Sequence, residues 1–152
     1  MADKDSERFV LRALAISDFD KGFMQLLGQL TVAGAVSEEQ FGERVKYLQE
    51  LGDDHYVAVI EDTEKGQIIA TGSVLIEHKF LRNCGKVGHI EDVVVDQTVR
   101  GQRLGQRIIE SLTQFAKDKG CYKVILDCSV ENAAFYEKCG YKRKEIQMAA
   151  YF

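Results

Sequence analysis

Gly88-His-Ile-Glu-Asp-Val-Val-Val-Asp96 leads through Gln-Thr-Val to Arg100-Gly-Gln-Arg-Leu-Gly105 and then to Gln106-Arg-Ile-Ile-Glu-Ser-Leu-Thr-Gln-Phe115. The β-branched run of the first segment predicts a strand, and apolar residues at positions 104, 108, 112 and 115 predict a helix. Glycines at 101 and 105 mark the loop between them. The N–H groups of a helix's first turn have no partner within the helix and lie at its positive end. This stretch therefore predicts an anion-binding loop.

Two familiar phosphate-binding loops are excluded by the residues around these glycines. A P-loop needs Gly-Lys followed by Ser or Thr, whereas Gly105 is followed by Gln106 and Arg107. The dinucleotide fingerprint Gly-x-Gly-x-x-Gly is absent. What remains is an Arg-Gly-x-x-Leu-Gly loop, which resembles the pyrophosphate loop of the GCN5-related N-acetyltransferases, the family that binds acetyl-CoA.

The composition predicts one globular domain over residues 1–152, with the polar residues 1–7 flexible. The sequence has no apolar run of 18 residues and begins with charged residues, so we expect neither a membrane span nor a secretory signal. We expect a cytoplasmic protein, and peripheral attachment to an internal membrane stays open.

Charge and cysteine spacing exclude two further classes of function. The net charge of −4 argues against nucleic-acid binding, which rests on a basic surface. The cysteines at 84, 121, 128 and 139 show neither a Cys-x-x-Cys pair nor a histidine at zinc spacing, so no metal is expected.

The remaining pattern predicts a mixed α/β sheet flanked by helices. A capping signal at Ser17 predicts a helix that buries Phe19, Phe23, Leu26, Leu27 and Leu30 and ends near Thr31 to Gly34. A second helix follows the capping box 37–40 and is closed by Gly52. Strands are predicted at 9–14, 56–60, 68–77, 122–127 and 145–152, and a short helix at 132–139.

Two later segments extend the resemblance to nearly the whole chain: Gly120-Cys-Tyr-Lys-Val-Ile-Leu-Asp-Cys128 and Asn132-Ala-Ala-Phe-Tyr-Glu-Lys-Cys-Gly-Tyr141. Together with Gly88-His-Ile-Glu-Asp92, they resemble the family members that acetylate glucosamine 6-phosphate. The resemblance implies a mixed, mostly antiparallel central sheet. It also implies direct attack of the sugar amine on acetyl-CoA in a ternary complex, giving N-acetyl-D-glucosamine 6-phosphate and CoA on the route to UDP-N-acetylglucosamine.

The reaction needs a proton donor for the leaving thiolate and groups that hold the amine. A tyrosine phenol suits the thiolate because both groups have fairly high pKa values, and the resemblance gives Tyr136 this role. It gives both Glu91 and Asp92 contact with the amino sugar and leaves open which of them contacts the amine, while the carbonyl of Asp127 is a further candidate to hold the amine. Adjacent residues of a strand point to opposite faces, so Glu91 and Asp92 should not both face the site unless a bulge intervenes.

The resemblance also implies the cofactor ligands. The open backbone of the strand around Val93 should pair with the pantetheine arm, and the loop N–H groups should bind the pyrophosphate. The predicted cofactor-binding residues are Val93, Val94, Val95, Arg100, Gly101, Gln102, Arg103, Leu104, Gly105, Gln106, Asp127, Cys128, Ser129, Asn132 and Tyr136. The family usually has glycine where this chain has Arg103, so we expect the loop to keep its shape if Arg103 has a negative φ.

A sugar phosphate needs cations, and the chain has lysines and an arginine at matching positions. The predicted substrate-binding residues are Thr31, Lys79, Phe80, Leu81, Arg82, Glu91, Asp92, Val93, Tyr122 and Lys123. As isolated residues, the lysines would be ordinary surface charges. The resemblance further implies a homodimer in which the C-terminal strand crosses to the partner, with phosphate ligands from one or both subunits.

Two alternatives stay open. The first is an acetyltransferase for another amine, such as a polyamine or a protein N-terminus, which would favour an acidic groove. The second is a non-catalytic CoA-binding module, which would not need Tyr136. A ping-pong route through Cys128 is disfavoured because no histidine is placed to lower its pKa.

Overall fold

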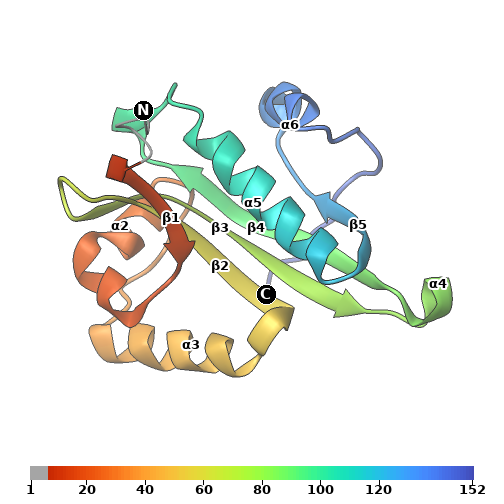
Figure 1. Cartoon of the computed structure of the whole chain (residues 1–152), viewed down its shortest axis with the longest axis horizontal. Helices are drawn as coiled ribbons and strands as arrows, with labels where there is room; N and C mark the ends of the chain where they lie inside the picture. Colours follow the sequence, from red (N-terminus) through yellow and green to blue (C-terminus); the bar gives the residue numbers. More distant parts are fainter. Residues whose placement is uncertain (1–6) are drawn as a thin grey trace.

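Residues 7–152 are described by a computed structural model, in which a central sheet is flanked by helices (Figure 1). The sheet has five strands in the order β1-β2-β3-β4-β5. Strands β1 to β4 are antiparallel neighbours, and β5 runs parallel to β4. The strands are β1 (Phe9–Ala13), β2 (His55–Asp62), β3 (Gln67–His78), β4 (Lys86–Val95) and β5 (Cys121–Leu126). The predicted mixed, mostly antiparallel sheet is confirmed. The flexibility expected for residues 1–7 falls, apart from Glu7, outside the described residues.

The helices begin and end largely where caps and glycines predict. They are α2 (Phe23–Leu27), α3 (Glu38–Glu50), α4 (Leu81–Cys84), α5 (Leu104–Asp118) and α6 (Ala133–Lys138), with 3-10 turns η1 (Ile16–Lys21), η2 (Gly52–Asp54), η3 (Gln97–Val99) and η4 (Val130–Asn132). The capping box of α3 is confirmed: Ser37 Oγ accepts from Gln40 N–H at 3.1 Å, and Gln40 Oε1 accepts from Ser37 N–H at 2.9 Å. No helix within residues 7–152 has both the length and the apolar character needed to cross a membrane.

Two hydrophobic clusters occupy the two faces of the sheet. On one face α5 buries Leu104, Ile108 and Leu112 against β2, β3 and β4. On the other face α2 and α3 contribute a cluster that includes Phe23 and Phe41. The spacing of apolar residues in α5 is that of a helix with one buried side, so this helix binds firmly to the sheet and fixes the loop that precedes it.

The first predicted helix is wrong in one respect: it is interrupted. Gly22 has φ +81°, a left-handed conformation that glycine adopts without a steric penalty, and it separates η1 from α2. Helix α2 ends at Leu27, and the predicted core residue Leu30 lies beyond it and is exposed. The start of the helix also differs from the prediction, because η1 is capped at Ala15 and not at Ser17. The Asp18 carboxylate accepts the Ala15 N–H there, at 2.8 Å.

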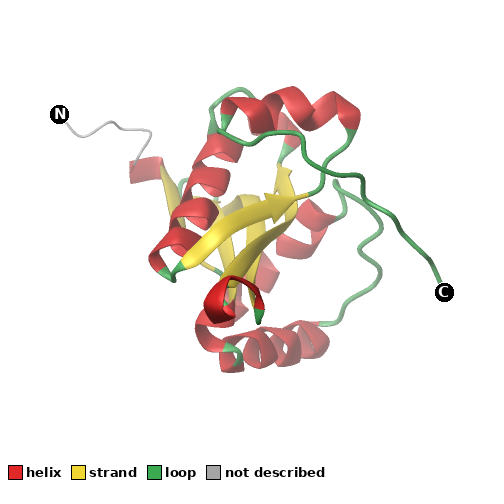
Figure 2. Cartoon of the chain, turned by 90° about the vertical axis from the view of Figure 1, so that its right-hand side faces the viewer, coloured by secondary structure: helices red, strands yellow, loops and turns green. Residues whose placement is uncertain are grey.

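The predicted C-terminal strand at 145–152 does not form within this chain. Figure 2 shows the C-terminal segment as an extended loop that runs away from the sheet, and Ile146, Met148 and Tyr151 are exposed. A strand needs a neighbour to satisfy its backbone N–H and C=O groups. The apolar alternation of this segment is therefore not matched by a pairing partner among residues 7–152.

An ion-pair network ties β1, η1 and β2 together. Arg12 donates from Nη1 and Nη2 to the two carboxylate oxygens of Asp18, at 2.8 and 2.7 Å, and from Nη2 to Glu61 at 2.8 Å. Lys21 completes the network by donating to Glu61 at 2.8 Å. Burial acts to raise the pKa of Asp18, but hydrogen bonds from Arg12 and Ala15 hold it below its ordinary value.

We predict that Asp18→Asn lowers the free energy of unfolding by about 3 kcal/mol near neutral pH, because Arg12 is left partly buried without its bidentate partner. A carboxylate whose pKa is lowered in the folded state stabilises the fold above its unfolded-state pKa, and this contribution is lost as the pH falls. The difference between the natural protein and the variant should therefore shrink as the pH falls below about 5, through the unfolded-state pKa and then the lower folded-state pKa of Asp18. Urea denaturation measures it.

Asp20→Asn is the matched control, since Asp20 lies in the same turn and is exposed. A similar loss of stability in both variants, or a difference that does not change with pH, would contradict the role given to Asp18.

Candidate active site

Strand β4 parts from β5 halfway along its length. The parallel pairing runs from Lys86 opposite Cys121 to Ile90 opposite Leu126 and ends there. On its other side β4 has a bulge: Thr71 pairs with Val94 and Ser73 with Glu91, so one residue of β3 lies opposite two of β4. Residues 91–95 of β4 therefore have no paired strand on the β5 side among residues 7–152, and their backbone borders a wedge between the two strands.

Glycine at position 72 lets α5 approach the sheet closely opposite this bulge. A Cβ atom on Gly72 would lie 2.7 Å from Ile108 Cγ2, inside the contact distance of two carbon atoms. Helix α5 thus sits directly on the backbone opposite the bulge. Within the bulge, Asp92 has φ +52°, which changes the direction of its side chain from strict alternation.

The bulge interrupts the strict alternation of side chains along β4, so Glu91 and Asp92 can both approach the wedge. Glu91 and Asp92 are both exposed. Partial burial raises the pKa of Glu91, and the charges of Asp92 and Asp127 raise it further. The carboxyl groups of β4 and of the residue that follows β5 therefore lie close enough to interact. His89 lies one pleat away and is bonded to Glu77, with Nε2 and Oε1 2.9 Å apart.

The anion loop joins β4 to α5. Asp96 caps η3, and residues 100–103 then lead into the first turn of α5. The negative φ at Arg103 on which the expected loop shape was conditional is not observed: its φ is +58°, in the left-handed region where the superfamily's glycine would be free of strain. Arg103, the residue before the first turn of α5, thus adopts a conformation that glycine reaches without a steric penalty.

Helix α6 places Tyr136 at the other side of the wedge. Burial raises the pKa of Tyr136, with the neighbouring Cys128 adding to the rise, so the phenol is protonated at neutral pH. The helix is anchored to α5, since the hydroxyl groups of Tyr141 and Thr113 are 2.5 Å apart. Phe135 packs toward the loop, where a Cβ atom on Gly105 would lie 3.1 Å from Phe135 Cζ.

Some of the predicted substrate residues gather at the tip of the sheet, and others do not. The Arg82 guanidinium lies 5.2 Å from the centre of the Tyr122 ring, and Lys123 Nζ lies 5.9 Å from it. Lys79 is turned toward Glu77, at 3.2 Å. Phe80 and Leu81 lie between Lys79 and Arg82 in the chain, and both are exposed.

Thr31 belongs to a different region. It follows α2, whereas Arg82 is in α4, and Figure 1 places these two helices at opposite ends of the sheet. Thr31 and Arg82 of one chain are therefore not brought together.

A cavity of about 910 Å³ opens between α2, α3 and the bulge. Asp92 lines it together with Thr71 and Ser73 of β3. Asp92 is the one residue predicted to bind substrate or cofactor that lines this cavity. No sequence pattern indicates the polar cavity residues of α3, because charged and aromatic residues on an amphipathic helix are ordinarily solvated. They are Gln40, Glu43, Arg44 and Tyr47.

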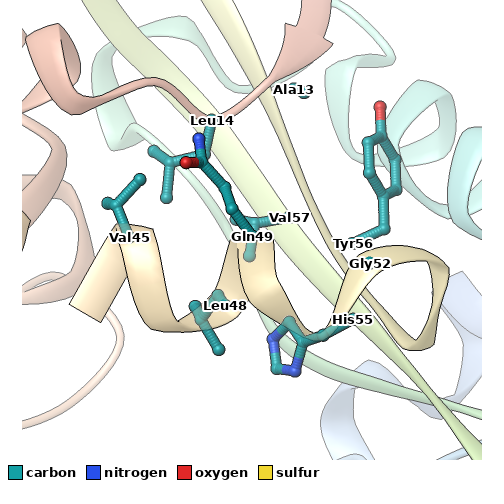
Figure 3. A pocket seen from close by; sticks show the side chains of 9 residues that line it. All are labelled: Ala13, Leu14, Val45, Leu48, Gln49, Gly52, His55, Tyr56 and Val57. Carbon is teal, nitrogen blue, oxygen red and sulfur yellow. The ribbon is translucent and has the colours of Figure 1, made fainter. Parts of the chain in front are cut away.

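A second cavity of about 240 Å³ lies beside the last turns of α3 (Figure 3). Its lining is largely apolar and includes Leu14, Leu48 and Val57, with His55 at one side. None of the predicted site residues lines it. Within residues 7–152, no group of His, Cys, Asp or Glu side chains is arranged to hold a metal ion.

Comparison with known proteins agrees with this geometry. Residues 23–141 match the profile described as "Acetyltransferase (GNAT) family". The chain is 59% identical over 147 residues to glucosamine 6-phosphate N-acetyltransferase of Arabidopsis thaliana, covering 97% of this chain and 99% of that one. It is 50% identical over 140 residues to glucosamine 6-phosphate N-acetyltransferase 1 of Dictyostelium discoideum, covering 92% and 88%.

Solved structures show the same similarity. The crystal structure of glucosamine-6-phosphate N-acetyltransferase from Arabidopsis thaliana superposes with a TM-score of 0.94 at 60% identity, covering 95% of this chain and 98% of that one. An acetyltransferase of Trypanosoma brucei gives a TM-score of 0.88 at 38% identity, covering 95% and 99%.

We predict that Arg103→Gly changes the free energy of unfolding by less than about 1 kcal/mol, because relief of the left-handed strain offsets the greater freedom of glycine in the unfolded chain. The dissociation constant for CoA should stay within about threefold of the natural value, since the loop N–H groups are retained. Thermal denaturation and calorimetric titration with CoA measure the two quantities.

Gln102→Gly is the control for the glycine effect. Gln102 is not among the residues with positive φ, so glycine there relieves no strain and should destabilise the fold. A large loss of CoA affinity in Arg103→Gly would show instead that the guanidinium itself binds the ligand.

Proposed function

Since the chain belongs to the acetyltransferase (GNAT) family, we propose that it transfers the acetyl group of acetyl-CoA to the amine of D-glucosamine 6-phosphate, giving N-acetyl-D-glucosamine 6-phosphate and CoA. The observation that carries the substrate is the 59% identity, over 97% of this chain, to a relative of that name. The product would serve the synthesis of UDP-N-acetylglucosamine.

The wedge between β4 and β5 supports the position of acetyl-CoA in this proposal. Its pantetheine arm would pair with the open backbone of Val93 to Val95, as an added strand would. The pyrophosphate would lie against the N–H groups of the loop and of the first turn of α5, with residues 100–106 around it. Further along the wedge, the segment from Asp127 to Ser129 and Asn132 would flank the arm.

The acids of β4 would hold the amine for direct attack on the thioester. Glu91 has a raised pKa and takes up a proton more readily than an ordinary carboxylate, so it would accept the proton that the sugar ammonium must lose before its nitrogen lone pair attacks the thioester. The carbonyl of Asp127 would orient the same nitrogen, and Asp92 would contact the sugar. As the N–C bond forms, the backbone N–H groups of the strand from Val93 would stabilise the oxyanion.

Tyr136 would complete the reaction. When the tetrahedral intermediate collapses, the C–S bond breaks and the electron pair passes to sulfur, which takes the phenolic proton. The raised pKa keeps this proton in place at neutral pH, and solvent then returns a proton to the phenolate. Cys128 needs no acetyl-enzyme role in this scheme.

The basic group at the sheet tip supports a phosphorylated sugar over a polyamine. The Arg82 guanidinium and Lys123 Nζ lie 5.2 and 5.9 Å from the centre of the same Tyr122 ring, and two cations this close attract phosphate and repel a polycation. The alternatives are an acetyltransferase for another small amine or a protein N-terminus, and a non-catalytic CoA-binding module.

We predict that the purified protein releases free thiol from acetyl-CoA with glucosamine 6-phosphate, and far more slowly with glucosamine or spermidine. Tyr136→Phe should lower kcat by about a hundredfold while the KM for acetyl-CoA changes little, because the phenol acts on the leaving group. A thiol-reactive dye measures both.

Turnover confined to spermidine would favour the first alternative, and no turnover with any amine would favour the second. An unchanged kcat in Tyr136→Phe would remove the acid assignment while leaving the substrate intact.

We also propose that two copies form a homodimer in which residues 145–152 cross to the partner. Strand β5 is the last of the sheet among the described residues, and its Tyr122 and Ile125 are each 39% exposed. Gln147 already lies beside the wedge, donating to Asp127 Oδ2 at 3.1 Å. Such a dimer would supply Thr31 and Arg82 to one site from different chains.

We predict a dimer mass in sedimentation velocity for the full chain and a monomer mass for a chain that ends at Lys144, because the exposed apolar segment would be missing. The paired substitution Ile146→Asp and Met148→Asp should act as the truncation does. A monomeric full chain with full activity would overturn the strand exchange.

A further inference from the structure

The side chain of Gln29 bridges two segments that are far apart in the sequence. Its Nε2 donates to Asp96 Oδ2 at 2.9 Å, and its Oε1 accepts from the Gln97 N–H at 3.0 Å. The partners fix the orientation of the amide, because a carboxylate can only accept and a backbone N–H can only donate. Both ends of this one carboxamide are thus used by the turn after β4.

Asp96, which accepts the hydrogen bond from Gln29, is also the residue that caps the turn η3. It is buried, and its Oδ1 accepts from Thr98 N–H at 2.8 Å and from Thr98 Oγ1 at 2.5 Å. Hydrogen bonds from Thr98 and Gln29 hold its pKa below the ordinary value, with the charge of Lys65 in the β2–β3 turn adding to the effect. The capped turn η3 leads directly into the anion loop. Gln29 therefore supports the start of that loop.

The other end of the bridge lies in the connection between α2 and α3, whose later residues form part of the wall of the large cavity. Gln29 begins the connection between α2 and α3, and Gly34, Ala35 and Val36 of the same connection line the cavity beside Asp92. The first residues of the connection are held to α2, since the N–H groups of Leu30 and Thr31 donate to the Leu27 carbonyl at 3.0 and 3.3 Å. The Gln29 side chain thus joins two parts of the proposed site. One is the connection beside the large cavity, called here the acceptor wall, where the amine would bind; the other is the anion loop, where acetyl-CoA would bind.

We propose that Gln29 is a positioning residue that couples the acceptor wall to the anion loop, so that binding of acetyl-CoA and binding of the amine support each other. The inference rests on the proposed function, because it assigns the two ligands to the two sides that Gln29 joins. Gln29 touches neither ligand and acts through Asp96 and Gln97.

Two substitutions test the coupling. Gln29→Ala removes both hydrogen bonds, and Gln29→Glu retains an acceptor for Gln97 but places a carboxylate against Asp96. Near pH 8 both should raise the KM for acetyl-CoA and the KM for glucosamine 6-phosphate by about fivefold to tenfold, with kcat within about twofold, because Tyr136 and β4 are unchanged. A change in only one KM, or in neither, overturns the coupling.

The pH profile separates a hydrogen bond from a merely structural effect. A carboxylate pair regains its hydrogen bond when it shares a proton, so the kcat/KM of Gln29→Glu relative to the natural protein should recover as the pH falls from about 7 to about 5. The same ratio for Gln29→Ala should stay flat. If the kcat/KM of Gln29→Glu relative to the natural protein does not recover at the lower pH, the assignment of Gln29 as a positioning residue is overturned.

Gln25→Glu is the matched control, because it adds the same charge at an exposed position of α2. It should leave both KM values unchanged. If the natural protein does not acetylate glucosamine 6-phosphate, the proposed function fails, and CoA titration then tests the bridge without an amine. Weaker CoA binding in Gln29→Ala would retain the support of the loop by Gln29, and unchanged binding would remove it.

Discussion

The parting of β4 from β5 after Ile90 is the constraint on which the rest of the site depends. A β-bulge turns the second half of β4, and it forms where Gly72 leaves room for Ile108 of α5. Without the bulge, strict alternation would send Glu91 and Asp92 to opposite faces of the sheet. The same distortion therefore opens the strand backbone and brings the acids of β4 to the wedge, while α5 holds both in place from the far face.

Local signals were enough to predict most of the fold. The capping box at Ser37, the glycine that ends α5 at Gly120 and the hairpin of β2 and β3 depend on residues that are neighbours in the sequence. The phosphate loop and the short helix with Tyr136 were predicted in the same way, with the family resemblance supplying their roles. Such features are set by backbone conformation and capping, which a few adjacent residues determine.

The features that could not be predicted depend on distant contacts. Gly22 interrupts the first helix while Asp18 turns inward to Arg12 of β1, a contact that no local pattern signals. Residues 145–152 alternate like a strand but find no neighbour among the described residues. The left-handed φ of Arg103 is imposed by the closure of the loop onto α5, against the preference of any L-residue. The separation of the substrate residues likewise appears only when the sheet is assembled.

In the proposed mechanism, partial burial along the wedge would act on the base Glu91 and on the acid Tyr136 in the way each role requires. It raises the pKa of Glu91 toward the range where a carboxylate accepts protons effectively, and the charges of Asp92 and Asp127 move it in the same direction. It also raises the pKa of Tyr136, which keeps the phenol protonated as a donor. One physical cause thus improves the base on β4 and preserves the acid on α6. Although the ordinary pKa values of Glu91 and Tyr136 are very different, the same partial burial would suit both groups to work at one pH.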